Sequence, residues 1–174
     1  KCYTKLFNLF QVTIDNPVSR GAFLKTSFMV KGAQIPAATL GTATVNYFGR
    51  EVKLAGNRTF EDWSVTIIND EDFLVRDGME RWSNAINGLE TNLRSFELAT
   101  TAQYKTNATV TQFSKTGLPL RTYNFVGIFP IAVDAIDLDW GTNDAVEEFG
   151  VTFAYDYWVA GEGAVGQVTN ALFG

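Results

Sequence analysis

The sequence gathers carboxylates around one short apolar run, and carboxylates are side chains that bind cations or transfer protons. In GNRTFEDWSVTIINDEDF, residues 56–73, five acidic residues flank that run: Glu61, Asp62, Asp70, Glu71 and Asp72. Glycoside hydrolysis needs two carboxylates at a defined separation. One candidate pair is Asp62 with Asp70, and another is Asp139 with Asp144. Since sequence fixes no separation, we favour the alternative that these are solvated strand ends.

A calcium loop is the best metal candidate. Asp137, Asp139 and Glu148 fall at positions 1, 3 and 12 of an EF-hand-like register. However, position 5 is Gly141, and position 6, which requires glycine, is Thr142. The chain then continues with the pattern of a strand, where an EF-hand has a helix. We therefore favour a strand end followed by a turn, and we expect no metal and no other cofactor.

Two further kinds of chemistry are poorly supported. The chain has no histidine, which excludes Ser-His-Asp and Cys-His arrangements. Tyr155, Tyr157 and Trp158 could form a platform for sugar stacking, but Tyr155 and Tyr157 share one face of a predicted strand, so core packing is the stronger interpretation. We expect that the protein is not an enzyme.

The composition indicates a globular protein. A chain of 174 residues with 46% hydrophobic and 19% charged residues can bury one sizeable core. A net charge of −5 makes a basic nucleic-acid-binding face unlikely. Cys2 is the only cysteine, so no intramolecular disulfide forms, and no apolar run approaches the roughly 20 residues of a membrane span. We expect no membrane insertion.

The dominant pattern along the chain is a period of two, which is typical of strands. The predicted strands cover residues 8–15, 23–30, 39–48, 63–68, 102–113, 120–127, 135–140 and 148–157. Phe129-Pro130 is expected to end one of them. Gly49-Arg50 and Gly56-Asn57 are turn signals, so the segment between them is a long loop or a hairpin.

One main helix, about residues 71–87, interrupts the strands. Val75, Met79, Trp82 and Ile86 recur at helical spacing. Asn69 or Asp70 is the expected N-cap, with Glu71 and Asp72 in the first turn and Asn87-Gly88 as a left-handed C-cap. We therefore predict a mainly β protein, an antiparallel β-barrel or sandwich with one flanking α-helix.

Several strand faces carry small polar side chains, where a free solvent face usually has more Lys and Glu. Such faces suit a sheet that lines a wet channel or packs on another subunit. The candidate residues are Thr42, Thr44, Asn46, Lys105, Asn107, Thr109 and Thr111. Residues 159–174 are rich in Gly and Ala, so we expect a main domain over residues 1–158 and a C-terminal extension over 159–174.

An ordered set of short blocks resembles the tail tube protein of contractile-tailed bacteriophages. The blocks, in chain order, are Asn8-Leu9-Phe10-Gln11-Val12, Gly56-Asn57-Arg58-Thr59-Phe60-Glu61-Asp62-Trp63, Asn69-Asp70-Glu71, Tyr104-Lys105, Gly127-Ile128-Phe129-Pro130, Leu138-Asp139-Trp140 and Asp156-Tyr157-Trp158. Each block is weak alone, whereas the ordered set, from about residue 8 to 158, is specific.

The resemblance implies a structural virion protein. In that family, which shares its fold with tubes of type VI secretion and bacteriocin-like systems, six subunits form a ring and rings stack into the inner tail tube. The inner sheets of neighbouring subunits join into one barrel around a lumen, the conduit for genome ejection. The resemblance also implies contacts with tail sheath, baseplate, tail terminator and tape measure proteins, and assembly of the virion in the host cytoplasm.

The net charge of the chain agrees with the implied role as a conduit for DNA. Six subunits at −5 give −30 per ring, and any part of it that faces the lumen repels DNA, so double-stranded DNA passes without specific binding. Arg50, Lys53, Asn57 and Arg58 form a candidate loop for stacking one ring on the next. A soluble β-sandwich binding module, for instance for carbohydrate, is the alternative function, and it predicts a monomer.

Overall fold

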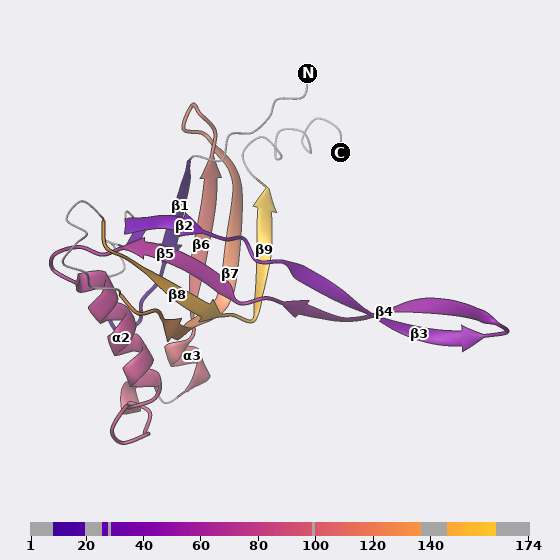
Figure 1. Cartoon of the computed structure of the whole chain (residues 1–174), viewed down its shortest axis with the longest axis horizontal. Coiled ribbons are helices and arrows are strands. Elements are labelled where there is room, and N and C mark those ends of the chain that lie inside the picture. The colour runs from indigo at the N-terminus through magenta and orange to yellow at the C-terminus, as the bar shows by residue number, and fades with distance from the viewer. Residues whose placement is uncertain (1–8, 20–25, 28, 99, 137–145, 163–174) are drawn as a thin grey trace.

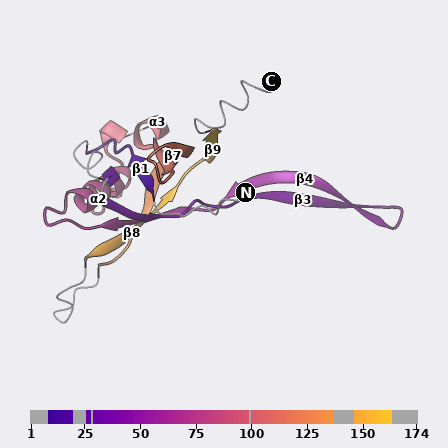
Figure 2. The ribbon, with the colours of Figure 1, turned by 90° about the horizontal axis from the view of Figure 1, so that it is seen from above.

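A computed structural model of the chain describes residues 9–19, 26–27, 29–98, 100–136 and 146–162 (Figure 1). The fold is mainly β, and every strand pair is antiparallel. Two sheets cross each other, and a long two-stranded hairpin projects away from them (Figures 1 and 2). The sheets form an open sandwich instead of a closed barrel, which confirms the predicted fold class.

Sheet A has the order β1, β6, β7, β9. Its strands are β1 (Phe10–Ile14), β6 (Thr106–Phe113), the first part of β7 (Pro119–Val133), and β9 (Tyr157–Glu162). Sheet B continues from the second part of β7 through β8 (Glu148–Ala154) and β5 (Trp63–Ile68) to β2 (Val30–Ala33). The strand β7 therefore belongs to both sheets.

Alternating side chains from both sheets build the core, as a period of two requires. In β5, Trp63, Val65 and Ile67 are almost completely buried. The Trp63 ring stacks on Phe125 of β7 with ring centroids 4.4 Å apart. The other core residues are Val12, Ile14, Val75, Met79, Trp82, Leu98, Ala108, Val110, Ile128, Phe149, Val151 and Phe153.

The main helix, α2 (Leu74–Ile86), covers the core beside sheet B (Figure 1). Its stripe is as predicted, with Val75, Met79 and Trp82 buried. The indole Nε1–H of Trp82 donates a hydrogen bond of 3.0 Å to the carbonyl oxygen of Tyr104. This bond ties α2 to the segment that precedes β6.

The predicted caps of α2 are wrong. A turn closed by the Phe73 N–H and the Asp70 carbonyl oxygen, 2.8 Å apart, delays the helix until Leu74. Glu71 and Asp72 therefore precede the first turn. The N-cap is Phe73, at φ 51°, and the C-cap Asn87 is extended at φ −145°, so no left-handed Asn87-Gly88 cap forms.

Two predicted strands begin differently. Within residues 23–30, Thr26, Ser27 and Met29 are helical, and the strand β2 starts at Val30, the last residue of the predicted strand. At the start of the predicted strand 102–113 lies the short helix α3 (Thr101–Tyr104), which follows the 3₁₀ turn η1 (Phe96–Leu98). The Thr100 N–H donates to the Gln103 side chain at 3.0 Å, which closes a capping box and starts α3.

The strand β7 does not end at Phe129-Pro130. Gly127, at φ 72°, and a register shift after Pro130 mark the place where β7 leaves sheet A and pairs with β8 in sheet B. The predicted strand 148–157 is likewise two strands, β8 and β9, joined by a corner at Tyr155-Asp156. Of the predicted strand 135–140, residues 137–140 lie outside the described residues, and 135–136 are irregular.

Candidate assembly surfaces

The acidic residues of segment 56–73 lie at the two ends of β5. Asp62 lies just before this strand and Asp70 just after it. Six residues of strand span roughly 20 Å, which is too long for a pair of glycosidase carboxylates. Asp137, Asp139 and Asp144 lie outside the described residues. The Glu148 carboxylate is paired with the Lys31 ammonium at 2.5 Å.

The part of the chain that the structure describes contains no group of three or more side chains suited to hold a metal ion. Among its helices, none combines the length and apolar character needed to cross a membrane. The notable features are instead two surfaces: the projecting hairpin and the outer face of sheet A.

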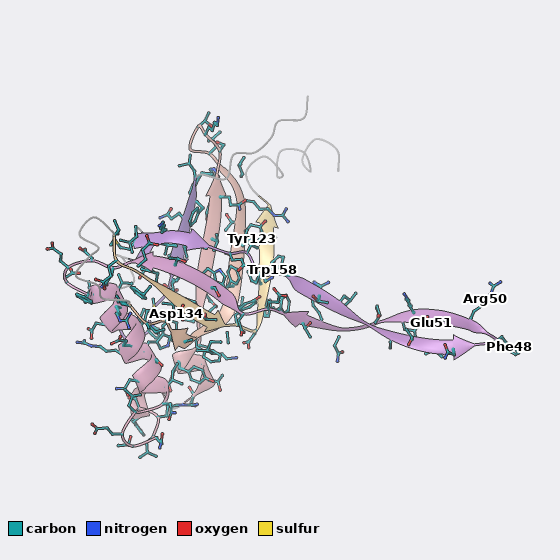
Figure 3. All side chains as sticks on the ribbon, viewed as in Figure 1. Phe48, Arg50, Glu51, Tyr123, Asp134 and Trp158 are labelled. Atoms are coloured by element: carbon teal, nitrogen blue, oxygen red, sulfur yellow. The ribbon has the colours of Figure 1, made fainter. Side chains whose placement is uncertain are left out.

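The hairpin consists of β3 (Ala38–Tyr47) and β4 (Arg50–Phe60). Figure 3 shows Phe48, Arg50 and Glu51 at its far end, well away from the body. Phe48 is 90% exposed and has a positive φ of 47° next to Gly49 at 74°, so these two residues make the tight turn. The segment between the two predicted turn signals is therefore neither a loop nor a hairpin by itself; it is part of β4, which forms a hairpin with the preceding strand β3.

Gly56-Asn57 is not a turn. Leu40 pairs with Arg58 and Thr42 pairs with Ala55, so Gly41 faces two residues of β4 in a β-bulge. A Cβ on either glycine would lie 3.1 Å from a backbone oxygen of the opposite strand. Glycines at this bulge therefore let the two backbones approach closely.

The two faces of the hairpin differ in chemistry. One face carries Thr42, Thr44 and Asn46 from the predicted channel face, opposite Ala55, Lys53 and Glu51. The other face carries Ala43 opposite Leu54 and Val45 opposite Val52. Val45, Val52 and Leu54 are 48%, 46% and 52% exposed. A two-stranded ribbon with an exposed apolar face is only marginally stable in water. We therefore expect another protein surface to cover this face.

All four residues of the candidate stacking loop, Arg50, Lys53, Asn57 and Arg58, lie on β4 and are exposed. Together with Glu51 they give the hairpin more positive than negative charges. No ion pair joins Arg50, Lys53 or Arg58 to another described residue. Their charges are therefore available to carboxylates outside the subunit.

Aromatic rings attach the base of the hairpin to the body. The ring centroid of Phe60 lies 5.9 Å from that of Tyr155 and 6.4 Å from that of Trp158. Tyr155 contacts Phe125 edge-on at 5.3 Å, and Trp158 contacts Tyr123 at 5.8 Å. Tyr155 is thus a packing residue, as the core interpretation predicted, but Tyr157 is 46% exposed and Trp158 packs in its place. The core prediction is therefore wrong for Tyr157, because the corner at Tyr155-Asp156 separates Tyr155 and Tyr157 into different strands.

The surroundings of the Tyr155 hydroxyl oppose its ionisation. Burial, together with the carboxylates of Asp62 and Glu61, raises the pKa of Tyr155 from 10.0 to about 12. Its oxygen is buried without a hydrogen-bond partner among the described residues. The neutral hydroxyl suits a packing role beside Phe60.

The outer face of sheet A, which points away from sheet B, bears no charged side chain within the described strands. Thr109 donates to the Asn124 side-chain oxygen at 3.2 Å, and the Thr111 and Thr122 hydroxyls lie 3.5 Å apart. Register places eleven residues on this face: Gln11, Thr13, Asn107, Thr109, Thr111, Thr122, Asn124, Val126, Tyr157, Val159 and Gly161.

Lys105 does not belong to that face. It precedes β6, its ammonium pairs with the Asp156 carboxylate at 2.5 Å, and it lies over the Phe129 ring at 5.9 Å from the centroid. Asp156 in turn lies against Gly127, where a Cβ would collide with the carboxylate. Lys105 therefore braces one end of sheet A, where β6, β7 and β9 meet.

The structure thus divides the predicted polar residues between two surfaces. Thr42, Thr44 and Asn46 lie on the hairpin, whereas Asn107, Thr109 and Thr111 lie on sheet A. The sequence does not predict β9 as a separate strand, because the composition of residues 159–162 resembles that of the Gly- and Ala-rich residues that follow. The alternation of Tyr157 and Val159 with Trp158 and Ala160 was the available signal. The expected domain boundary after Trp158 falls inside β9, and residues 163–174 lie outside the described residues.

Comparisons with known proteins agree on one family. The sequence model described as phage tail tube protein matches residues 6–161. Tail tube protein gp19 of Enterobacteria phage T4 is 31% identical over 152 residues, covering 87% of this chain and 88% of that protein.

Solved structures share the fold at low sequence identity. The anti-feeding prophage tube terminating cap has a TM-score of 0.68 at 16% identity and covers 93% of both chains. The PVC sheath/tube terminator of an extracellular contractile injection system has a TM-score of 0.65 at 14% identity, covering 91% of this chain and 97% of that one.

Proposed function

Because the chain belongs to the phage tail tube protein family, and is thus a structural protein of the virion tail, we propose that six copies close into a ring. Stacked rings then form the inner tube of a contractile tail, through which the genome is ejected into the host. In this role the protein carries out no catalysis and needs no cofactor.

The observation that carries this proposal is the pair of open edges of sheet A. Among the described strands, β1 pairs only with β6, and β9 pairs only with β7. Exposed strand edges invite pairing with another chain, and closing a sheet on itself removes them. The two edges belong to different strands of one subunit, so they make a head-to-tail contact, which generates a ring when the rotation closes.

The outer face of sheet A then lines the lumen. We infer that its hydroxyl and amide side chains keep the DNA hydrated without holding it. Binding to DNA needs clustered Lys and Arg that release counterions from phosphates, and none lies on this face among the described residues. The free passage of double-stranded DNA thus follows from the lack of cations on the lining rather than from the net charge of −5.

The hairpin supplies the contact between rings. Its apolar face needs a protein surface that shields it from water; this face is formed by Ala43, Val45, Val52 and Leu54. Its basic residues Arg50, Lys53 and Arg58 have no carboxylate partner among the described residues. We propose that the hairpin lies on subunits of the adjacent ring, with its apolar face buried and its basic residues beside carboxylates.

The proposed tube implies contacts with other proteins of the tail. One neighbour by fold is named as a tube terminating cap and another as a sheath/tube terminator. We propose corresponding contacts of this tube with a tail sheath, a terminator and a baseplate, and that a tape measure protein occupies the lumen before DNA. We also propose that assembly takes place in the host cytoplasm.

Negative-stain electron microscopy of the concentrated protein tests the proposal. We expect rings with six-fold symmetry, and stacks of rings at higher concentration. A monomer that persists at every concentration and salt condition would overturn the tube proposal in favour of the soluble binding module. Rings of another symmetry would overturn the proposed number of six subunits, whereas the proposed role of the tube as a conduit would remain.

A further inference from the structure

The segment after α2 holds three large apolar side chains in water. We call residues 87–98, from the end of α2 through η1, the 87–98 loop. In this loop Leu89, Leu93 and Phe96 are 86%, 71% and 93% exposed. Large apolar side chains gathered on one exposed segment mark a site of interaction with another protein.

The backbone of the 87–98 loop is held by its own hydrogen bonds. The Gly88 N–H donates to the Leu93 carbonyl oxygen at 3.1 Å, which closes the loop on itself. The Ser95 N–H donates to the Ala85 carbonyl oxygen at 3.0 Å, which fastens the loop to α2. The exposed apolar side chains therefore stand on an ordered backbone, and a partner that covers them has little of the loop left to order.

The 87–98 loop lies at one end of sheet A. The Arg94 guanidinium sits over the Tyr104 ring, 4.7 Å from its centroid, and Tyr104 ends α3, the short helix that leads into β6. Figure 1 shows the loop at the lower end of the molecule and the turn between β6 and β7 at the upper end. Strand ends form the two rims of a closed barrel, whatever the tilt of the strands. In the proposed ring, the loop and the turn therefore lie on opposite rims.

The β6–β7 turn, residues 114–118, is also ordered and also exposes an apolar side chain. The Ser114 N–H donates to the Leu118 carbonyl oxygen at 2.8 Å, and the Leu118 N–H donates to Ser114 Oγ at 3.1 Å. Leu118 is nevertheless 60% exposed. This turn thus offers the opposite rim an apolar side chain on a fixed backbone.

The two rims carry opposite charges beside their apolar side chains. Glu90 of the loop and Lys115 of the turn are both exposed, and neither forms an ion pair with another residue that the structure describes. Arg94 of the loop is already engaged, because its Nε–H donates to the Ile86 carbonyl oxygen at 3.4 Å and its guanidinium lies over Tyr104. The loop therefore offers a carboxylate where the turn offers an ammonium group.

We propose that the 87–98 loop of one copy docks on the β6–β7 turn of a copy in the adjacent ring. Phe96, with Leu89 and Leu93, covers Leu118, and the Glu90 carboxylate lies beside the Lys115 ammonium. This inference rests on the proposed stacking of rings and adds to it a second contact, separate from the hairpin. Because the turn joins two strands of sheet A, this contact lies close to the lumen.

A second copy fits the loop because the loop and the turn cannot meet within one chain. Each copy carries one loop and one turn at opposite ends of sheet A, so the contact is head-to-tail and leaves both surfaces open at the two ends of any stack. Such a contact repeats without limit along an axis. It also makes every ring face the same way, since a loop rim fits a turn rim and not another loop rim.

Aspartate substitutions at the two rims test the contact. We expect Phe96→Asp and Leu118→Asp each to form rings, and to raise the protein concentration at which rings stack by about tenfold or more, because each places a charge where a large apolar side chain is buried. The matched control is Val146→Asp, which alters a side chain that is 63% exposed and lies just before β8, on neither surface. The control should stack like the wild type in sedimentation velocity.

Mixing the two variants tests whether the loop and the turn are partners. Rings of Phe96→Asp keep an intact turn rim, and rings of Leu118→Asp keep an intact loop rim. Preformed rings of the two, mixed at a concentration where neither stacks alone, should form pairs of rings and no longer stacks. Mixtures that contain only single rings would overturn the partnership of loop and turn.

A charge exchange gives an independent measurement. Glu90→Lys and Lys115→Glu should each weaken stacking at low salt, by less than Phe96→Asp does, and the double variant should recover it. Double-variant stacking no better than that of the weaker single variant would overturn the pairing of Glu90 with Lys115.

The presence of rings separates this contact from the proposed function. Stacking of Phe96→Asp and Leu118→Asp at the wild-type concentration would overturn the contact and leave the tube in place. Loss of rings in either variant, while the wild type forms them, would place that residue in the contact within a ring and would also overturn the inference. The absence of rings in the wild type and all variants would overturn the proposed ring itself.

Discussion

Replacing Val45 with Asp puts a carboxylate on the apolar face of the hairpin, and Thr44→Asp puts the same group on its polar face. The two residues are neighbours on one strand, so both variants have the same charge and the same distance from the tip. Only Val45 belongs to the surface that we propose is buried between rings. We expect Val45→Asp to form rings that do not stack, whereas Thr44→Asp stacks like the wild type.

The size of the effect follows from the exposed fractions. Val45, Val52 and Leu54 are each about half exposed, and covering the exposed half of such a side chain stabilises by about 1 kcal/mol. One hairpin thus contributes about 3 kcal/mol, or about a 100-fold change in affinity, before ordering costs. Val45→Asp removes about 1 kcal/mol of this and adds the cost of desolvating a charge. Repeated over six hairpins, the loss exceeds about 6 kcal/mol per ring.

Sedimentation velocity measures the outcome, because single rings and stacks separate by size, and electron microscopy identifies both. Tubes of Val45→Asp at the wild-type protein concentration would refute the buried apolar face. Loss of rings together with tubes would place the hairpin in the contact within a ring. Equal defects in Val45→Asp and Thr44→Asp would mean that charge, not burial, governs the hairpin.

Four further predictions concern charge, core, backbone and pH. Arg58→Glu should raise the protein concentration needed for tubes at low salt and less so at high salt, because exposed pairs contribute only about 0–1 kcal/mol each; unchanged assembly at low salt would count against a basic stacking surface. Trp63→Ala should lower the free energy of unfolding by about 3–5 kcal/mol in urea titrations, since the ring is fully buried; a loss below about 1 kcal/mol would show that the core is built differently. Gly127→Ala should destabilise by more than Gly117→Ala, which has a similar φ of 80° but open space around its Cβ; equal losses would leave backbone strain as the only cause. The raised pKa of Tyr155 means that folding favours its neutral form, so stability present below pH 10 is lost as the pH rises through about 12; Tyr155→Phe should retain its free energy of unfolding further into that range, and identical alkaline unfolding curves would contradict this.

Strand faces could be read from the sequence because burial itself produces the alternation. Trp63, Val65 and Ile67 are buried on one face for the same reason that they recur at every second position. The stripe of α2 follows in the same way from a period near 3.6. Element ends are harder, because a single backbone turn at Asp70–Phe73 moves the start of the helix without changing the pattern.

The sequence does not show which strands pair with each other. Nothing in the local pattern distinguishes the Thr-rich face of β3 from that of β6, yet the first projects on a hairpin and the second lies in sheet A. The sequence predicts a strand end at Pro130 because proline usually stops a strand, whereas in the structure a bulge lets β7 change sheets there. Long-range pairing decides both cases, and sequence periodicity carries no information about it.

The sharing of β7 between the two sheets has a mechanical consequence. A load applied to sheet A reaches sheet B along the covalent backbone of one strand, Pro119–Val133, and not only through side-chain packing. The two layers therefore cannot slide past each other unless β7 gives up its pairing with β6 and β9 or with β8. A subunit built in this way responds to an axial push as one stiff piece, so any compliance of the tube resides between subunits, at the seams and hairpins.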